Sequence, residues 1–372
     1  MSGRHALPAA DAAGAAPVLA QARQCADAFW RRLVAWQKTH GRSTLPWQNT
    51  RDPYRVWLSE IMLQQTQVST VLGYYERFLQ RCPTVADLAA APEDEVMGLW
   101  SGLGYYSRAR NLQRCAQEVV ARFGGRFPPS AELLQTLPGI GRSTGAAIAA
   151  FCFGERVSIM DGNVKRVLSR LLAFEGDLGS SANEKLLWKA ADQLLPPAGD
   201  TEAISRYTQG LMDLGATVCL PRQPQCLICP VEALCEGRRQ GDPARLPVKT
   251  RKLKRSAQSL WLLLARSSGG EGVWLQKRPA SGIWAGLHAL PAFDSAEALE
   301  AALPAALRGT ARHWPAFKHV LTHKDLHLHP VEVWLDAQTL AGIDGRWVAD
   351  TAWPALGLPA PVRLLLEARA AD

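Results

Sequence analysis

The stretch Leu137-Pro-Gly-Ile-Gly-Arg-Ser-Thr144 decides which fold the sequence predicts, because it places a Gly-x-Gly turn between two helices. A short helical stretch that starts at Ser130 precedes the turn, and the small, apolar residues 145–153 follow it. Such a turn directs backbone N–H groups outward at a helix N-terminus, where they can hold a phosphate without reading its base. The same pattern also fits an ordinary helix hairpin. On the first interpretation, the phosphate contacts come from Gly139, Gly141, Ser143 and Thr144.

The segments on either side of this turn indicate two domains. From residue 21 to about residue 235, apolar residues recur at helical spacing, and Pro and Gly separate the segments. Beyond a basic stretch, residues 260–265, 273–277 and 326–334 fit strands, and residues 296–307 and 360–368 fit helices. We therefore expect a mainly α domain and a smaller α+β domain. The expected segments are a disordered leader at residues 1–20, an all-α domain at residues 21–237, a basic linker at residues 238–257 and an α+β domain at residues 258–372.

Charge is unevenly distributed between these domains. The 372-residue chain carries 42 Lys and Arg against 34 Asp and Glu, a net charge of +8. Residues 259–372 hold 10 basic and 11 acidic residues, so the remaining 32 basic and 23 acidic residues give residues 1–258 a net charge of +9. Residues 238–255 alone hold eight basic residues against Asp242. A polyanionic partner would therefore bind the first part, although the basic stretch is equally well explained as a solvated linker.

Composition also limits the expected location. No apolar run approaches the ~18 residues that a membrane span needs, and the Ala- and Pro-rich start lacks a secretory apolar region. Four of the eight cysteines are bunched and four are scattered, which favours a metal site in a reducing compartment over disulfides. We expect a cytoplasmic protein, associated with the nucleoid if it is bacterial, and a monomer.

Asp161 is one candidate catalytic residue, and it starts the segment Asp161-Gly-Asn-Val-Lys-Arg-Val-Leu-Ser-Arg170. Asp is a frequent helix N-cap because its carboxylate accepts hydrogen bonds from free N–H groups. The positive end of a helix also favours the ionised carboxylate, and an anion there can stabilise a developing sugar cation. Both roles are compatible. Asn163, two residues further on, would orient water or Asp161 itself.

Glu60 is a second candidate, in Val56-Trp-Leu-Ser-Glu-Ile-Met-Leu-Gln-Gln-Thr-Gln-Val68. On a helix, Glu60 shares a face with Val56, Trp57, Leu63 and Gln64. A lone Glu among such residues usually reaches water at the rim of the helix. If Glu60 is buried instead, the loss of hydration raises its pKa and makes it a general acid. Two carboxyl groups with separated pKa values would then form an acid and an ion stabiliser.

The bunched cysteines have the spacing C-x6-C-x2-C-x5-C, at Cys219, Cys226, Cys229 and Cys235. Structural zinc usually brings two Cys-x2-Cys pairs, and this segment has one. The cysteine runs of ferredoxins are more closely spaced. Spacing alone therefore predicts only a metal site with four thiolate ligands.

Together these features resemble the MutY-type adenine DNA glycosylases of the helix-hairpin-helix base-excision superfamily. The resemblance extends from about Phe29 to Cys235 and is weaker beyond. Four further motifs support it: Thr44-Leu-Pro-Trp-Gln48, Leu63-Gln-Gln-Thr-Gln67, Gly102-Leu-Gly-Tyr-Tyr-Ser-Arg108 and Met212-Asp-Leu-Gly-Ala216. The resemblance implies a helix-hairpin-helix glycosylase domain whose four cysteines hold a [4Fe-4S] cluster, with zinc as the alternative.

The resemblance also implies a reaction. Adenine mispaired with 8-oxoguanine or guanine in double-stranded DNA is extruded and removed by hydrolysis. Glu60 would protonate the adenine, and Asp161 would stabilise the cationic sugar. Gln64 and Tyr105 would push into the duplex, although a loop aromatic such as Tyr105 more often packs on a core.

One position separates the chain from bifunctional relatives. Endonuclease III-like enzymes carry a Schiff-base lysine two residues after the second hairpin glycine, where this chain has Ser143. The resemblance therefore implies a monofunctional glycosylase. The alternatives are an endonuclease III-like glycosylase and lyase for oxidised pyrimidines, and a non-catalytic DNA-binding iron–sulfur module.

The C-terminal domain resembles the Nudix-like domain of the same proteins, through Gln276-Lys-Arg-Pro-Ala-Ser-Gly-Ile-Trp-Ala-Gly-Leu287. Its helix at residues 296–307 offers only Glu297 and Glu300 for a metal, so we expect no pyrophosphate hydrolysis. Leu321-Thr322-His323 takes the place of a lesion-reading F-S-H loop, in which Thr322 and His323 keep a hydroxyl and an imidazole while Leu321 replaces an aromatic. The nearby His327 and His329 alternate along a strand, which favours surface histidines over a metal site.

Overall fold

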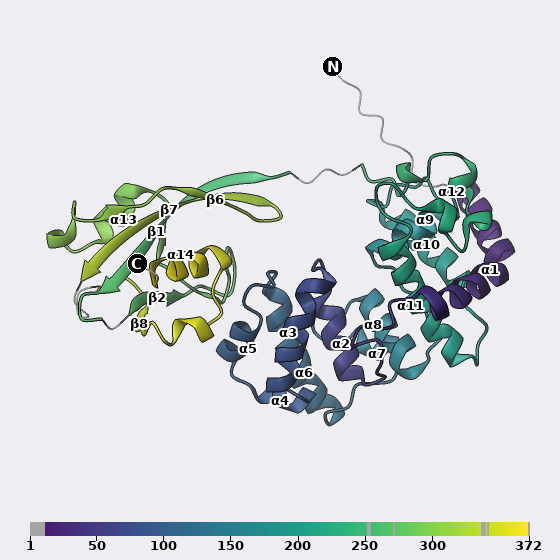
Figure 1. Ribbon diagram of the computed structural model, residues 1–372, viewed down its shortest axis with the longest axis horizontal. Coiled ribbons are helices and arrows are strands. Elements are labelled where there is room, and N and C mark those ends of the chain that lie inside the picture. The colour runs from purple at the N-terminus through teal and green to yellow at the C-terminus, as the bar shows by residue number, and fades with distance from the viewer. Residues whose placement is uncertain (1–11, 251–253, 271, 336–339, 341, 371–372) are drawn as a thin grey trace, which may run out of the picture. The chain divides into compact units, whose positions relative to one another are not determined.

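The computed structural model describes residues 12–250, 254–270, 272–335, 340 and 342–370 (Figure 1). The chain forms two compact units, each built from two segments. Unit 1 joins Met1–Ile61 to Glu118–Lys252, and unit 2 joins Met62–Gln117 to Leu253–Asp372. The expected all-α domain is therefore divided, because its residues 62–117 group with the C-terminal part of the chain.

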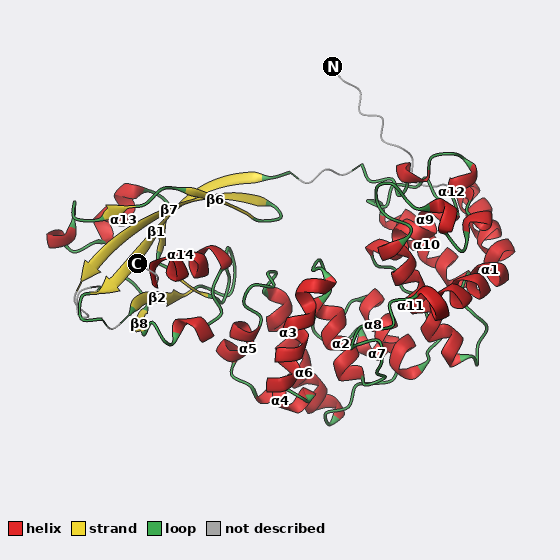
Figure 2. Cartoon of the chain, in the orientation of Figure 1, coloured by secondary structure: helices red, strands yellow, loops and turns green. Residues whose placement is uncertain are grey.

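Unit 1 is helical (Figure 2). α1 (Ala12–His40) packs on α10 (Ser181–Gln193) and α11 (Thr201–Thr217). Phe29 and Leu33 lie one helical turn apart on α1 and are completely buried. The Phe29 ring meets Tyr207 of α11 edge to face, with ring centroids 6.0 Å apart. The other helices of the unit are α2 (Pro53–Met62, which ends at the unit boundary), α7 (Ala131–Leu134), α8 (Arg142–Ile148), the π-helix η1 (Ala149–Phe153), α9 (Gly162–Leu171), the 3-10 helices η2 (Cys226–Ile228), η3 (Glu232–Leu234) and η4 (Pro243–Arg245), and α12 (Glu236–Arg239).

α1 begins within the segment that we expected to be disordered. Residues 12–20 are helical, whereas residues 1–11, the rest of the expected leader, lie outside the described residues. Alanine has the highest intrinsic helix propensity and makes up most of residues 12–20. One turn further along, Ala22 and Cys25 are buried in the core of unit 1. Favourable propensity next to a buried face therefore extends the helix toward the N-terminus.

Unit 2 combines helices with a mixed sheet, which confirms the expected α+β domain. The strand order is β3-β2-β1-β7-β5, with β4 beside β1, β6 beside β7 and β8 beside β2. β1 and β7 run parallel, and the other pairs are antiparallel. The strands are β1 (Ser256–Ser267), β2 (Val273–Lys277), β3 (His288–Ala289), β4 (Ala292–Phe293), β5 (Arg312–His313), β6 (Phe317–Val320), β7 (Lys324–Leu335) and β8 (Arg346–Val348). The helices are α3 (Val68–Arg81), α4 (Val85–Ala90), α5 (Glu93–Leu99), α6 (Ser107–Phe123, which crosses into unit 1), α13 (Ala296–Ala302), the 3-10 helices η5 (Ala305–Leu307) and η6 (Trp353–Ala355), and α14 (Ala360–Ala370).

Side chains of β1 alternate between two cores, one on each face of the sheet. Leu262 lies in the core that includes Val362 of α14, and Leu263 lies in the core that includes Leu299 of α13. Because both faces are covered, β1 has a nearly continuous apolar sequence. The three strands expected from the sequence are confirmed as β1, β2 and β7. The helix expected at residues 296–307 is interrupted, because Pro304 removes a backbone donor and disfavours helical backbone at the residue before it.

Polar contacts attach α5 and the loop before α6 to the C-terminal part of unit 2. The Tyr106 hydroxyl donates to the carbonyl oxygen of Leu358 over 2.9 Å. Lys277 Nζ lies 2.7 Å from a carboxylate oxygen of Asp94 on α5. These contacts explain why residues 62–117 group with the C-terminal part. Among the described residues, no helix is long and apolar enough to cross a membrane.

Candidate active site

Glu60 lies on α2 among buried side chains of unit 1. Trp57 is completely buried, Ile61 almost completely, and Glu60 between them is partly buried. Burial raises the pKa of Glu60 to about 8, and the negative charge of Asp161 contributes to the increase. Of the two interpretations of Glu60, the structure therefore supports the buried acid.

Asp161 is the N-cap of α9, as the sequence predicts. Its Oδ1 accepts a hydrogen bond from the backbone N–H of Val164 over 2.7 Å. Burial raises the pKa of Asp161, whereas the N–H groups of Val164 and Asn163 and the positive charges of Arg166 and Lys165 act in the opposite direction. We expected the helix end to favour the ionised form, and that influence is present. The loss of hydration has the larger effect, so the pKa of Asp161 is raised overall. The sequence pattern does not reveal this burial.

The side chain of Asn163 faces Arg166 and accepts a hydrogen bond from it. Arg166 Nη2 donates to Asn163 Oδ1 over 2.8 Å and to the carbonyl oxygen of Gly215 over 2.6 Å, while its Nε donates to the carbonyl oxygen of Cys219 over 2.7 Å. A side chain at Gly215 would collide with Asn163, since an added Cβ lies 2.6 Å from the Asn163 Cβ. Hydrogen bonds therefore connect the residues after Asp161 to the start of the cysteine segment.

The Gly-x-Gly turn joins α7 to α8. Gly139 has φ +77°, a conformation that favours glycine, and Gly141 is the exposed N-cap of α8. Thr144 lies in the first turn of α8 and is partly exposed. Ser143 Oγ accepts from the backbone N–H of Met160 over 2.9 Å. Ser143 therefore attaches the hairpin to the segment that leads into Asp161.

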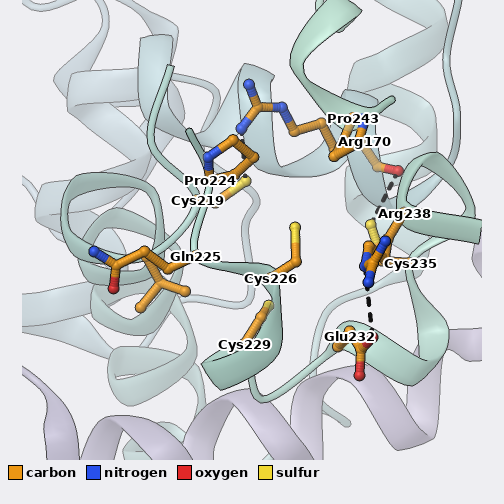
Figure 3. A pocket seen from close by; sticks show the side chains of 11 residues that line it. Arg170, Cys219, Pro224, Gln225, Cys226, Cys229, Glu232, Cys235, Arg238 and Pro243 are labelled. Atoms are coloured by element: carbon orange, nitrogen blue, oxygen red, sulfur yellow. Dashed lines mark hydrogen bonds and ion pairs between the residues drawn. The ribbon is translucent and has the colours of Figure 1, made fainter. Parts of the chain in front are cut away.

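The four bunched cysteines line one cavity (Figure 3). The cavity is partly open to solvent, has about 310 Å³ of empty space including that open part, and is also lined by Arg170 and Arg238. Burial is the main cause that raises the pKa of Cys229 to about 12 and of Cys235 to about 11, and neighbouring thiolate charges add to it. These raised pKa values mean that Cys229 and Cys235 keep their protons at neutral pH, whereas a metal or cluster would bind them as thiolates and displace those protons.

Arg170 contacts several of the segments that line this cavity. Its side chain is almost fully buried, and Nη1 lies 3.3 Å from Cys219 Sγ. The thiol of Cys235 lies 3.4 Å from the carbonyl oxygen of Arg170. The guanidinium also donates to three backbone carbonyl oxygens of the surrounding segments, those of Leu220, Pro221 and Leu246.

Gln64 and Tyr105 lie in loops of unit 2. We expected Gln64 to share a helical face with Glu60, and this prediction is wrong. α2 ends at Met62, so Gln64 lies in the turn that follows the helix. Gln65, with φ +58°, ends the helical path. Tyr105 also has a positive φ of +49° and is 43% exposed. Its exposure contradicts the interpretation of Tyr105 as a residue packed on the core.

The Leu321-Thr322-His323 segment forms the turn between β6 and β7. Thr322 and His323 are exposed, whereas Leu321 packs against the core under α14. Arg255 Nη2 donates to the carbonyl oxygen of Leu321 over 3.0 Å and also pairs with Asp325. The Thr322 hydroxyl lies 2.9 Å from the Tyr105 hydroxyl. The turn therefore presents a hydroxyl and an imidazole, but no apolar side chain.

The other candidate groups of the α+β region have structural contacts. Glu300 accepts from the backbone N–H of Gly309 over 3.3 Å. His329 stacks on Trp261 with ring centroids 4.4 Å apart, and His327 is exposed. Within the described part of the chain, no group of three His, Cys, Asp or Glu side chains is arranged to hold a metal ion, and this finding includes the four cysteines that line the cavity.

Much of the basic stretch at residues 238–255 is ion-paired. In unit 1, Arg245 lies 2.6 Å from a carboxylate oxygen of Glu175, and Arg239 lies 2.5 Å from Glu236. These pairs reduce the positive charge that the described part of the stretch offers to phosphate, whereas residues 251–253 lie outside the described residues.

Comparisons with known proteins agree with this architecture. Residues 58–193 match the HhH-GPD superfamily base excision DNA repair proteins, and residues 260–368 match the NUDIX domain. An adenine DNA glycosylase of Buchnera aphidicola subsp. Baizongia pistaciae (strain Bp) is 34% identical over 343 residues, which cover 91% of this chain and 95% of that protein. The chain belongs to the adenine DNA glycosylase family. Its members are hydrolases of N-glycosidic bonds that act in base excision repair.

Two further relatives match mainly the helical part of this glycosylase. The human adenine DNA glycosylase is 46% identical over 228 residues, covering 59% of this chain and 41% of the human protein. A solved structure of a thermostable thymine-DNA glycosylase has a TM-score of 0.51 and 30% identity, covering 59% of this chain and 98% of that one. These matches confirm the helix-hairpin-helix fold expected from the sequence.

Four arginines of the glycosylase are functional candidates that the sequence analysis did not select. Each donates hydrogen bonds to backbone carbonyl oxygens of a candidate residue or its neighbours. From the sequence alone, each would be predicted to be an exposed surface residue. The sequence offers one signal that an arginine is buried, which is its position on a predicted helix among apolar neighbours. Arg170 shows this signal most clearly. These residues are Arg108, Arg166, Arg170 and Arg255.

Proposed function

We propose that this glycosylase removes adenine mispaired with 8-oxoguanine, or with guanine, and leaves the DNA strand intact. The observation that carries the proposal is the position of Glu60 on α2, among buried side chains and close to the carboxyl group of Asp161, where burial raises the pKa of Glu60 to about 8. At neutral pH Glu60 holds its proton, which a carboxyl group in water would have lost. A protonated acid and a carboxylate are the pair that cleavage of a glycosidic bond requires.

Each carboxyl group has one task in the proposed reaction. Glu60 gives its proton to N7 of the extruded adenine, so that the base leaves as a neutral molecule. The bond between C1′ and N9 breaks, and the electron pair goes to the base. Asp161 stabilises the oxocarbenium-like sugar that remains, and water adds to C1′ to give an abasic site. Asn163, whose side chain accepts a hydrogen bond from Arg166, would orient the water or Asp161 itself.

The DNA contacts are proposed from the exposed turns. Gly139, Gly141, Ser143 and Thr144 would hold a backbone phosphate at the start of α8. Gln64 and Tyr105 would enter the duplex, where their exposed loops support base extrusion. Thr322 and His323 would hydrogen-bond the altered edge of 8-oxoguanine, and Leu321 would add no stacking contact because it packs inward.

The cysteine cavity would hold a [4Fe-4S] cluster through Cys219, Cys226, Cys229 and Cys235. A set of four thiolates around a shared space suits an iron–sulfur cluster or zinc, and membership of the adenine DNA glycosylase family favours the cluster. The proposed hydrolysis transfers no electrons, so the role of the cluster is to order residues 219–235. We propose that the glycosylase acts as a monomer on double-stranded DNA.

One assay separates the proposal from its alternatives. The protein is incubated with a duplex that contains a single A:8-oxoguanine pair, and the products are resolved with and without alkali. Strand breaks that require alkali support a monofunctional adenine glycosylase. Breaks without alkali indicate an endonuclease III-like lyase. Duplex binding without any break indicates a non-catalytic module.

A further inference from the structure

Arg108 is a buried, charged residue of unit 2 to which the proposed reaction assigns no role. It is the second residue of α6, and it is 8% exposed. Burial lowers the pKa of Arg108 to about 10, which shows how much hydration the guanidinium has lost. Five neutral oxygens accept hydrogen bonds from it: Met62 O at 3.0 Å and Gln64 O at 2.6 Å from Nη1, and Thr66 Oγ1, Leu103 O and Gly104 O, each at 3.2 Å, from Nη2.

These oxygens belong to two loops that are distant in sequence. Nη1 binds the loop that follows α2, which carries Gln64, whereas Nη2 bridges Thr66 of that loop to the loop before α6, which carries Tyr105. A guanidinium is planar and holds its donors in a fixed fork. A single side chain therefore sets the distance and the orientation between the two loops.

Both loops contain strained backbone beside an oxygen that Arg108 binds. Gln65, with φ +58°, follows Gln64, and Tyr105, with φ +49°, follows Gly104. A residue with a side chain adopts this conformation only where its surroundings hold it. The ring of Tyr105 also lies against the guanidinium, whose Cζ is 5.4 Å from the ring centroid.

We infer that Arg108 is a positioning residue that holds the Gln64 and Tyr105 loops in the geometry that enters the duplex and extrudes adenine. This inference rests on the proposed function, in which those two side chains enter DNA. Arg108 acts through the loops and does not contact the reacting atoms. Its loss therefore slows extrusion, while the proton transfer from Glu60 keeps its own pH dependence.

The test compares Arg108→Lys with Arg114→Lys, an exposed arginine on the same helix. Lysine keeps the charge but cannot bridge both loops with a fixed fork. Extrusion is followed by the fluorescence of 2-aminopurine placed opposite 8-oxoguanine in a duplex, and adenine release by single-turnover kinetics. For Arg108→Lys we expect extrusion to be slower by about tenfold or more, given the hydrogen bonds lost. The pH at which the release rate falls should be unchanged, and Arg114→Lys should match the wild type.

A double variant tests whether Arg108 acts through the Tyr105 loop. In a Tyr105→Ala background, Arg108→Lys should have a clearly smaller effect on extrusion than in the wild type. The inference is overturned if the two substitutions reduce the extrusion rate by factors that multiply in the double variant. It is also overturned if Arg108→Lys extrudes the base at the wild-type rate. If Arg108→Lys does not fold, Thr66→Val removes one acceptor while keeping Arg108, and it must still slow extrusion. Wild-type protein that binds the duplex but releases no adenine contradicts the proposed function instead, and the fluorescence change still tests Arg108.

Discussion

The hydroxyl oxygens of Tyr105 and Thr322 lie 2.9 Å apart, although 217 residues separate them in the sequence. Tyr105 is the residue that we expect to enter the duplex, and Thr322 is one that we expect to contact 8-oxoguanine. A hydroxyl can accept one hydrogen bond and donate another at the same time. Thr322 can therefore accept from Tyr105 and still donate to a base, which joins the two proposed DNA contacts in one network.

Glu60→Gln should abolish adenine release and preserve binding to a duplex with an A:8-oxoguanine pair. The substitution removes the proton donor and keeps the side-chain volume. General acids contribute about 10²–10⁴-fold to rates, so the single-turnover rate should fall by at least about 10²-fold. In the wild type, the rate should decrease as the pH rises through about 8, where Glu60 loses its proton. A rate in Glu60→Gln near that of the wild type would remove Glu60 from the mechanism.

The same variant should be more stable than the wild type. Because the folded protein raises the pKa of Glu60 from 4.5 to about 8, the stability that the protonated group contributes is complete below pH 4.5 and is lost as the pH rises through 8. At pH 7 the free energy of unfolding of Glu60→Gln should exceed that of the wild type by ~3 kcal/mol. Urea unfolding at pH 5 and pH 7 measures this gain, which should shrink at the lower pH.

Asp161→Asn should lose activity while the fold remains intact. Asparagine can still accept the hydrogen bond from Val164 as an N-cap, but it carries no charge to stabilise the sugar cation. We expect the single-turnover rate to fall by about 10²-fold or more. Asp200→Asn is a matched control, since Asp200 caps α11 in the same way through Ala203. If both variants lost activity equally, Asp161 would be a cap without a catalytic role.

Ser143→Lys should confer some strand cleavage, because it places an amine where bifunctional relatives form an imine with the abasic sugar. The substitution also removes the hydrogen bond that Ser143 accepts from Met160, so the overall rate should decrease. Ser143→Ala loses the same hydrogen bond and provides no amine, which makes it the control. Borohydride should trap a covalent DNA adduct with the lysine variant alone. Absence of any adduct would count against the position assigned to the hairpin.

Cys226→Ser should lower both the iron content and the affinity for DNA, because each ligand helps to order residues 219–235. The wild-type protein, purified anaerobically, should be yellow-brown and contain about four iron atoms per chain. Cys25→Ala serves as the control, since Cys25 is buried in the core of unit 1 and lies outside the cavity. A colourless wild-type protein with stoichiometric zinc would contradict the cluster.

Local patterns predicted most of the elements. The apolar run of β1, the N-cap at Asp161 and the Gly-x-Gly turn are each decided by neighbouring residues, and the structure confirms them. The division of the helices between two units could not be predicted, because it depends on contacts such as that of Tyr106 with Leu358, which are 252 residues apart. Residues 12–20 were misjudged because composition alone does not show that Ala22 has a core to pack against.

The sequence was sufficient to select the candidate residues, but it did not reveal the neighbouring groups that determine their burial, pKa and position. Glu60 could be selected from the sequence, yet the choice between a surface residue and a buried acid required knowledge of its burial. The arginines that bind loop carbonyl oxygens escaped notice for the same reason. A backbone carbonyl has no sequence signal, so the partners of Arg108 and Arg255 are known only from the fold.

The last prediction concerns the Thr322 turn. Replacing Thr322 and His323 together by alanine removes a hydroxyl and an imidazole that are exposed, and Arg255 still holds the backbone of the turn through Leu321 and Asp325. The preference for A:8-oxoguanine over A:G should therefore decrease by ~1–3 kcal/mol, the typical value of a specific base contact. Single-turnover rates and duplex affinities on both mispairs measure this preference.

Truncation after Arg255 is a less selective form of the same test. We expect it to reduce the preference while largely preserving bond cleavage by Glu60 and Asp161, which belong to unit 1. It also removes the Leu358 carbonyl that Tyr106 binds, so the loop that carries Tyr105 loses support, and extrusion should slow on both mispairs. The alanine pair keeps the contact between Tyr106 and Leu358 and loses the contact between the Thr322 and Tyr105 hydroxyls. A second pair, His313→Ala with Thr351→Ala, removes one imidazole and one hydroxyl from exposed positions outside the turn. An unchanged preference in both the Thr322 variant and the truncated protein would assign recognition of 8-oxoguanine to the helical residues before the linker.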